Sequence, residues 1–249
     1  MEWRDEGVVL TARRHGERDA ILSLFTFEHG RHRGLVKGGT GRRQRPLLQS
    51  GNRLSCRWRA RLPEHLGVWT LEPVRLYAGA LLDDPAALSA VGAACGLLEL
   101  GLAEREPHPR LYAGLVSLLE HLAARTPDWP VRYVRFELLL LGELGFGLEL
   151  SACAVTGTTE DLAFVSPKSG RAVSRAAAGP WAPRLLPLPA FLVGDAPATD
   201  ADVLAGLRTT GHFLERHLLA PHGRLQPLAR ARLLQLLAAR AGEEGGGAS

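Results

Sequence analysis

The clearest alternation of polar and apolar residues in the chain runs from residue 53 to residue 62. Successive side chains of a β-strand point to opposite faces, so this run predicts a strand with two different faces. The polar face consists of Arg53, Ser55, Arg57, Arg59 and Arg61. The apolar face consists of Leu54, Cys56, Trp58, Ala60 and Leu62. The apolar face suits a core, whereas a row of arginines repels itself unless an anion neutralises it. We expect that anion to be a nucleic-acid backbone.

Four further runs complete an all-β segment over residues 1–76. They span residues 7–13, 20–27, 30–37 and 68–72, and glycine or proline follows each of them closely. Five short strands in about 70 residues match the small barrels, among which the OB-fold is the leading five-stranded case. A small SH3-like barrel is the alternative that the pattern leaves open.

The apolar period changes to that of helices after residue 76. Asp84 followed by Pro85 indicates a helix start, because Asp caps free N–H groups and Pro fits the first turn. Apolar residues recur three or four apart from there to residue 104. Similar patterns predict helices over 111–124, 131–144, 197–219 and 227–240. Gly145 fits the position just after the helix that ends at residue 144.

These patterns predict an α+β protein, with an N-terminal five-stranded OB-fold-like barrel followed by an all-helical domain that carries an insert. The predicted parts are the barrel (1–76), the helical domain's first part (77–150), the insert (151–180), the helical domain's second part (181–241) and a flexible tail (242–249). The tail is acidic and then glycine-rich, and chain ends of this kind are poorly ordered.

The charge of the chain is concentrated near its beginning. The formal net charge is +4, but residues 1–62 hold 14 Lys or Arg against 6 Asp or Glu, so this segment carries +8 and the rest −4. Such asymmetry indicates a polyanionic partner. The three cysteines form no disulfide framework, and we find neither a signal peptide nor a bilayer-spanning apolar run. We therefore expect a cytoplasmic protein that makes no membrane contact.

Ten basic residues make up the predicted nucleic-acid interface. They are Arg31, Arg33, Lys37, Arg42, Arg43, Arg45, Arg53, Arg57, Arg59 and Arg61. No aromatic residue shares the basic face of the 53–62 strand, so we expect contacts with phosphates and little sequence preference. Trp58, Trp69 and Phe25 are predicted to lie in the core instead. For each single arginine, the alternative is an ordinary solvated charge.

Several segments of the chain, in this order, resemble the RecO family of bacterial recombination mediators. They are Glu2 to Leu10 with His15 to Glu17, Gly30-Arg31 with Gly34 to Gly38, Arg135 to Leu138 with Leu144 to Gly147, and Gly211 to Leu214. The resemblance covers nearly the whole chain. It implies a non-enzymatic, nucleoid-associated DNA repair protein that binds single- and double-stranded DNA and anneals complementary strands. It further implies that RecA is loaded, with RecR and possibly RecF, onto strands coated by single-stranded-DNA-binding protein.

Many relatives in that family carry a four-cysteine zinc site in the insert. Here Cys153 stands where the first ligand would be, but Thr156 stands at the second position and residues 166–174 contain no cysteine. A structural zinc ion needs four ligands. We therefore predict a degenerate zinc-finger-like insert that holds no metal, and no cofactor elsewhere in the chain.

The resemblance also implies that the helical domain binds the acidic C-terminal tail of single-stranded-DNA-binding protein. Such a peptide needs an apolar groove with a cation at its rim. Arg132 and Arg135 lie three apart on one predicted helix and are the candidate cations, with Tyr133, Leu138 and Leu139 as the groove. The alternative is that Arg135 pairs with an internal carboxylate, such as Glu99 or Glu137.

A search for catalytic motifs finds none. The chain has no Gly-x-Ser-x-Gly elbow, no phosphate-binding loop motif and no histidine pair with metal-ligand spacing, so we predict no catalytic residues. Two other functions fit the same residues. One is a protein-interaction adaptor that acts through its helical domain, and the other is an RNA-binding OB-fold protein. The charge pattern does not distinguish DNA from RNA.

Overall fold

The computed structural model describes residues 1–246, and it describes side chains as far as residue 242. Residues 247–249 of the predicted tail therefore lie outside the described part of the chain. Two compact units are present. The first, called the barrel unit, consists of residues 1–126 and 227–230. The second consists of residues 127–226 and the chain from residue 231 onward, and it is called the insert unit because it includes the predicted insert (151–180).

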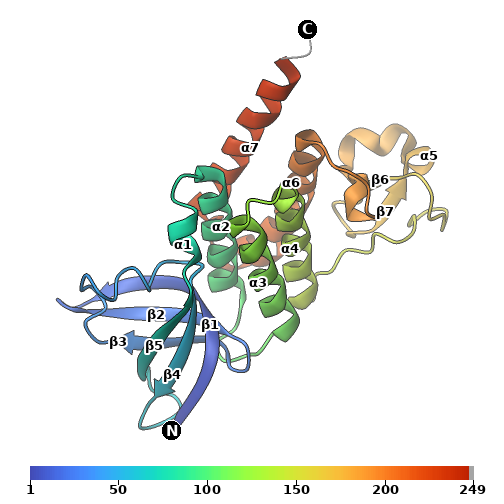
Figure 1. The fold of residues 1–249 in the computed structure, drawn as a ribbon. Helices are drawn as coiled ribbons and strands as arrows, with labels where there is room; N and C mark the ends of the chain where they lie inside the picture. The colour runs from blue at the N-terminus through green and yellow to red at the C-terminus, as the bar shows by residue number, and fades with distance from the viewer. Residues whose placement is uncertain (247–249) are drawn as a thin grey trace. The chain divides into compact units, whose positions relative to one another are not determined.

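Five strands form a closed barrel at the beginning of the barrel unit (Figure 1). They are β1 (Glu2–His15), β2 (Asp19–Thr26), β3 (Gly30–Val36), β4 (Arg53–Arg59) and β5 (Val68–Arg75). The strand order is β1-β2-β3-β5-β4, and β1 also pairs with β4 to close the ring. The β3–β5 pair is parallel and the other pairs are antiparallel. This is the Greek-key barrel of an OB-fold, so the predicted fold class is confirmed and the SH3-like alternative is set aside.

The alternation predicted for the 53–62 run is confirmed in β4. Leu54, Cys56 and Trp58 are buried in the barrel core, and Trp69 joins them as predicted. Phe25 is also buried, but its ring lies edge-on to Tyr112 at 5.6 Å and it does not belong to the core cluster inside the barrel. The indole N–H of Trp58 donates to the carbonyl oxygen of Leu66 at 3.0 Å, which satisfies its one polar atom inside the barrel. The strand ends at Arg59, however, two residues before Arg61. Leu62 is consequently exposed and does not belong to the core.

Three helices follow the barrel in the same unit, namely α1 (Tyr77–Ala80), α2 (Pro85–Gly101) and α3 (Pro109–Ala123). Asp84 caps α2 as predicted, because its carboxylate accepts the backbone N–H groups of Ala86 and Ala87. The buried face of α2 reaches β1, where the Cys95 thiol lies 3.5 Å from the carbonyl oxygen of Val9. The short helix α1 has too few residues to show a period and was not predicted.

Up to residue 246, the insert unit contains four α-helices and a small sheet. The helices are α4 (Trp129–Glu143), α5 (Arg175–Ala178), α6 (Asp200–Leu214) and α7 (Leu228–Gly246), the last of which starts in the barrel unit. The strands β6 (Leu162–Val165), β7 (Ala172–Ser174) and β8 (Leu186–Pro187) form the sheet in the order β7-β6-β8. Strands this short leave no visible period in the sequence. Gly145 follows α4 with φ 84°, as its predicted place after the helix requires.

Short helical turns join these elements of the insert unit. They are the 3-10 turns Gly179–Arg184, Ala190–Leu192 and Ala220–His222, and a π-helical turn over Glu215–Leu219 that continues α6. Helix α6 begins three residues later than predicted, because Thr199 and Asp202 form a capping box at its start.

None of the helices within residues 1–246 is long and apolar enough to cross a membrane.

Candidate nucleic-acid interface

The ten predicted basic residues fall into two groups that differ in their partners. One group faces carboxylates of the same chain and will be called the paired arginines: Arg31, Arg33, Arg53, Arg57 and Arg59. The other group has no carboxylate partner among the described residues and will be called the unpaired cations: Lys37, Arg42, Arg43, Arg45 and Arg61. This division was not visible in the sequence.

The arginines of β4 meet acidic residues of β1, its antiparallel neighbour. Arg53 forms an ion pair with Glu6, and this hydrogen bond raises the pKa of Arg53 against the lowering effect of burial. Arg57 and Arg59 lie 3.6 and 4.0 Å from the carboxylate of Glu2. The predicted repulsion along β4 is therefore relieved in part inside the protein. An external anion is not required for this strand to be stable.

The arginines of β3 hold the segment that follows the barrel. The Nη1 atom of Arg31 lies 3.4 Å from the carboxylate of Glu99, and its Nε donates to the carbonyl oxygen of Leu102 at 2.9 Å. Arg33 forms an ion pair with Glu104. The Arg31 side chain is only 13% exposed. We therefore assign Arg31 to the stability of the barrel unit.

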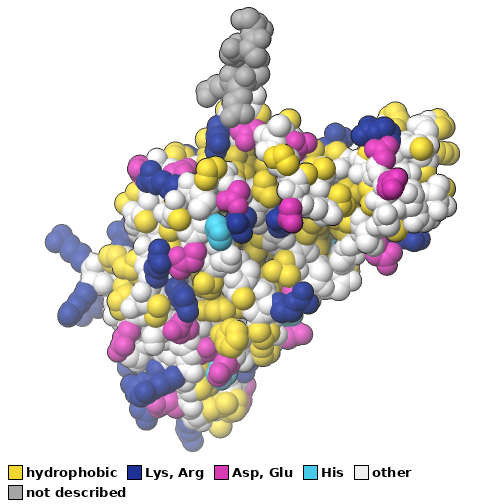
Figure 2. All heavy atoms as spheres, turned by 45° about the vertical axis from the view of Figure 1, so that its right-hand side comes forward, with side chains coloured by type: hydrophobic (Ala, Val, Ile, Leu, Met, Phe, Trp, Pro, Cys, Tyr) yellow, Lys and Arg dark blue, Asp and Glu magenta, His cyan; other side chains and the backbone are white. Residues whose placement is uncertain are grey.

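The unpaired cations Lys37, Arg42, Arg43 and Arg45 lie in and beside the glycine-rich loop after β3, and all are exposed. The loop is folded into consecutive turns, in which the N–H groups of Gly41 and Arg45 donate to the carbonyl oxygens of Gly38 and Gly41 at 2.9 and 3.0 Å. Figure 2 shows Lys and Arg side chains that stand out at the left of the view, whereas lower down blue and magenta groups lie side by side. Cations without internal partners are the ones available to an external anion.

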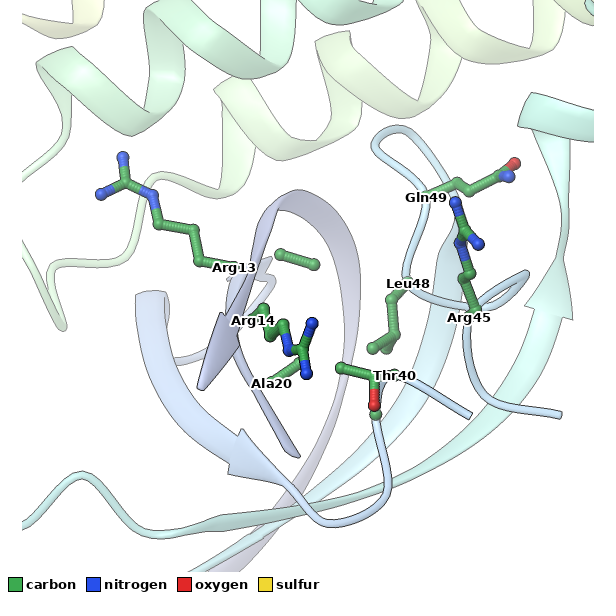
Figure 3. Close-up of a pocket in the computed structure, with 9 residues that line it drawn as sticks. Arg13, Arg14, Ala20, Thr40, Arg45, Leu48 and Gln49 are labelled. Atoms are coloured by element: carbon green, nitrogen blue, oxygen red, sulfur yellow. The ribbon is translucent and has the colours of Figure 1, made fainter. Parts of the chain in front are cut away.

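Two further arginines, Arg13 and Arg14, lie near the end of β1 and were not predicted. They line a pocket of about 610 Å³ (Figure 3). The other lining residues are Ala12, Ala20, Gly39, Thr40, Arg45, Leu48 and Gln49. The sequence carried a signal for this pair, because adjacent arginines stand just before the turn between the first two predicted strands. In OB-folds that turn is one of the ligand-binding loops.

Inside the barrel, His32 is surrounded by aromatic rings. Its ring lies edge-on to Trp3, Trp58 and Trp69, at centroid distances of 5.0, 4.7 and 5.9 Å. His32 is 4% exposed, and neither ring nitrogen has a hydrogen-bond partner among the described residues. Burial, assisted by the charge of Arg105, lowers the pKa of His32 to about 4. His32 is consequently neutral at pH 7 and adds no charge to the interface.

The two predicted partner-binding arginines, Arg132 and Arg135, lie on α4 in the insert unit. Arg132 donates to Asp128 at 2.7 Å. Arg135 donates to the carbonyl oxygens of Phe191 and Gly194 at 3.0 and 2.9 Å. It lies 3.5 Å from the exposed carboxylate of Asp195, so it faces a carboxylate of its own chain, as the alternative expected, although not that of Glu137. The Glu137 carboxylate instead accepts a hydrogen bond from Thr210.

A pocket of about 350 Å³ lies beside Arg135. Its apolar lining comes from Pro127, Pro130, Val131, Ala196, Pro197, Ala198 and Val203. The predicted groove residues Tyr133, Leu138 and Leu139 are not among the residues that line it. Asp128, Asp195 and Asp200 also line the pocket and give its rim both signs of charge.

The residues around Cys153 do not fit a structural zinc ion. Its thiol accepts the backbone N–H of Ser174 at 3.3 Å. Burial acts to raise the pKa of Cys153, but hydrogen bonds from Ser174 and Thr156 outweigh it and lower the pKa to about 6. One thiol with two hydroxyl neighbours does not supply four zinc ligands. Over the described part of the chain there is no group of three or more His, Cys, Asp or Glu placed to hold a metal.

Apolar contacts hold the insert instead. Cys153, Val173 and Ala178 form a buried cluster against which Leu162 and Phe164 pack.

An OB-type barrel with unpaired cations on its outer surface is typical of single-strand-binding modules. Comparison with known proteins then gives the family. The family models described as Recombination protein O N terminal and Recombination protein O C terminal match residues 1–77 and 82–226.

Full-length relatives agree with these matches. The chain is 55% identical over 240 residues to the DNA repair protein RecO of a strain of Cereibacter sphaeroides, which covers 96% of this chain and 99% of that protein. It is 51% identical over 241 residues to the DNA repair protein RecO of a Ruegeria species, covering 96% of this chain and 100% of that protein. The chain belongs to the RecO family of DNA repair proteins.

Proposed function

We propose that this protein binds single- and double-stranded DNA, anneals complementary strands and helps to load RecA onto strands coated by single-stranded-DNA-binding protein. The observation that carries the proposal is the set of unpaired cations around the loop after β3. Duplex DNA carries about one negative charge per 1.7 Å of its axis, and cations that bind phosphates release condensed counterions. The paired arginines contribute less to the free energy of counterion release, because they already face Glu2, Glu6, Glu99 and Glu104.

Annealing follows from the same electrostatics. Two strands repel each other through their phosphates, and a surface that neutralises part of that charge lowers the repulsion as they meet. Base pairing then supplies the favourable free energy. The protein acts in this scheme by binding alone, without a catalytic step and without a cofactor. We place it in the cytoplasm, at the nucleoid, where RecR and possibly RecF would act with it.

The acidic tail of single-stranded-DNA-binding protein is the second proposed partner. The pocket beside Arg135 offers the apolar lining that the end of such a tail needs, and a half-exposed guanidinium at its edge. The three aspartates in the lining oppose an acidic peptide, so Arg135 has to supply the attraction. Titration of a labelled tail peptide against wild type and Arg135→Ala tests the site, and equal affinities would contradict it.

The experiment that tests the proposed function is annealing of complementary oligonucleotides coated by the cognate single-stranded-DNA-binding protein. The informative variant is Arg42→Ala/Arg43→Ala, which removes two unpaired cations. The matched control is Arg57→Ala/Arg59→Ala, which removes the same charge from arginines that already face Glu2. We expect wild type to accelerate annealing, the first variant to lose most of this acceleration and the control to lose little.

Two outcomes would overturn the proposal. If the protein accelerates no annealing and yet binds the tail peptide, the adaptor function is favoured. If it binds RNA more tightly than DNA of the same sequence, the RNA-binding function is favoured.

A further inference from the structure

The pocket beside the β1–β2 turn has two walls that are both fastened to the barrel. The first wall is the start of the loop after β3. The N–H of Gly38 donates to the Asp19 carboxylate at 2.9 Å, and the N–H and hydroxyl of Thr40 donate to the carbonyl oxygen of Arg18 at 3.0 and 2.9 Å. A Cβ atom on Gly39 would lie 2.7 Å from the Cβ of Ala20, so only glycine lets the loop lie this close to β2.

The second wall is the segment that leads into β4. The hydroxyl of Ser50 donates to the carbonyl oxygen of Leu10 at 2.8 Å. The N–H of Gly51 donates to the carbonyl oxygen of Val9 at 2.8 Å. The side-chain amide of Asn52 donates to the carbonyl oxygen of Pro46 at 2.8 Å. Residues 45–49 are thus held against β1. These hydrogen bonds define the form of the pocket's second wall.

The lining combines three arginines with an apolar floor. Figure 3 shows the Arg14 guanidinium beside Thr40, Leu48 next to them, and Arg45 with Gln49 beyond Leu48. Arg14 is oriented by its own turn, because its Nε and Nη2 donate to the carbonyl oxygens of Gly16 and Glu17 at 3.1 and 3.2 Å. Arg45 has no carboxylate partner among the described side chains. Arg13 extends away from the others in this view.

We propose that this pocket binds one nucleotide of a DNA strand, with its base or sugar on Ala20 and Leu48 and its two flanking phosphates at Arg14 and Arg45. The inference rests on the proposed function and names a subsite within it. The volume of about 610 Å³ lies within the ordinary range of small-ligand pockets. The planar guanidinium group of arginine makes bidentate hydrogen bonds with phosphate oxygens. The apolar floor offers a contact surface to the base or sugar of a nucleotide, which a simple carboxylate ligand lacks.

The carboxylates of the β1–β2 turn do not neutralise this site. Asp19 accepts the N–H of Gly38. Glu17 is exposed, and within the described residues it forms no ion pair with Arg14 or Arg45. An anion in the pocket therefore meets two guanidinium groups whose charge is not already used.

Fluorescence anisotropy with a labelled oligothymidine of about 16 nucleotides tests the site. The variants are Arg45→Gln and Arg14→Lys, the second of which keeps the charge and loses the planar fork. The control is Arg33→Gln, which removes an exposed barrel arginine that faces Glu104. We expect Arg45→Gln to reduce the log–log salt slope by about 0.7 and to weaken binding about three- to tenfold, with little change in the control. Arg14→Lys is expected to weaken binding less.

Competition shows which part of the strand is bound. Thymidine 3′,5′-bisphosphate should displace the labelled strand from wild type better than thymidine 5′-monophosphate, and inorganic phosphate should do so least. Cross-linking of a strand containing 5-iodouracil should give adducts within residues 40–49.

The outcomes separate the two proposals. If wild type binds no DNA, the proposed function itself fails. If wild type binds and Arg45→Gln behaves like Arg33→Gln, the pocket inference alone is overturned. If an acidic peptide displaces the strand better than the bisphosphate does, the pocket is a protein-binding site and the inference is also overturned.

Discussion

Arg31 of β3 and Glu99 of α2 form an ion pair, with Nη1 3.4 Å from Oε1, in which both side chains are mostly buried. The second oxygen of Glu99 accepts the hydroxyl of Ser23 at 2.6 Å. An arginine that the sequence suggested for DNA contact therefore joins the barrel to the helix beside it. Removal of one partner of a buried pair leaves the other charge without compensation.

Arg31→Ala is accordingly predicted to lower the free energy of unfolding by about 2–4 kcal/mol. Urea unfolding followed by circular dichroism measures the change. Arg33→Ala serves as the control, because Arg33 is half-exposed. Its partner Glu104 also lies 3.6 Å from Arg31 and so keeps a cation beside it when the Arg33 side chain is removed. Equal stability of the Arg31 variant and wild type would show that the pair contributes nothing.

The unpaired cations should set the salt dependence of DNA binding. If four to six phosphates are neutralised, the log–log slope on single strands is about −3 to −4. Arg42→Ala/Arg43→Ala should reduce its magnitude by about 1.4, since each contact contributes about 0.7. The two variant side chains are exposed, so the unfolding free energy should stay within about 0.5 kcal/mol of wild type. Affinity that does not respond to salt would contradict this prediction.

Gly30 occupies a position that no other residue fits. Its φ is 65°, and a Cβ atom there would overlap the backbone of Glu106. Gly30→Ala should therefore destabilise the protein by at least about 3 kcal/mol, measured as the shift in the urea midpoint. Gly16 has a similar φ of 60° with nothing within 4 Å of its Cβ position. Gly16→Ala should cost only the backbone strain, about 1 kcal/mol.

His32 should make the stability of the protein acid-sensitive. Its folded-state pKa of about 4 lies below the ordinary 6.5, so the folded state resists protonation. The contribution of neutral His32 to the free energy of unfolding is complete above about pH 6.5 and is lost as the pH falls towards 4. The loss amounts to about 3 kcal/mol.

The His32→Leu variant separates this effect from that of the carboxylates. It should lose less stability than wild type when the pH falls from about 7 to about 4.5, as urea titrations at both pH values would show. The exposed His65→Gln is the control and should follow wild type. A His32→Leu profile parallel to that of wild type would exclude His32 as the source.

The three cysteines should differ in their reaction with iodoacetamide. Burial raises the pKa of Cys56 and Cys95 to about 12, whereas hydrogen bonds lower that of Cys153 to about 6. All three thiols are buried, so each reacts when local opening exposes it, and the thiolate is the reactive form. Cys153 should therefore be modified first when peptides are followed by mass spectrometry. Thr156→Ala should slow its modification. Faster labelling of Cys56 or Cys95 would contradict the assignment.

The sequence alone determined the barrel and its inner face. Alternation over residues 53–59 identifies which side chains of β4 are buried, because the side-chain period of a strand is two whatever surrounds it. Asp84 at the start of α2 is equally local, since a cap depends on groups within one turn.

Only the tertiary structure decided which cations are available. Glu2 and Glu6 reach the arginines of β4 because barrel closure places β1 beside that strand, and Glu99 reaches Arg31 because α2 packs beside the barrel. Coulomb energy depends on distance in space, and sequence separation does not report it. The same reason hid the pocket: Arg14 and Arg45 are far apart along the chain, and hydrogen bonds between loops bring them to one site.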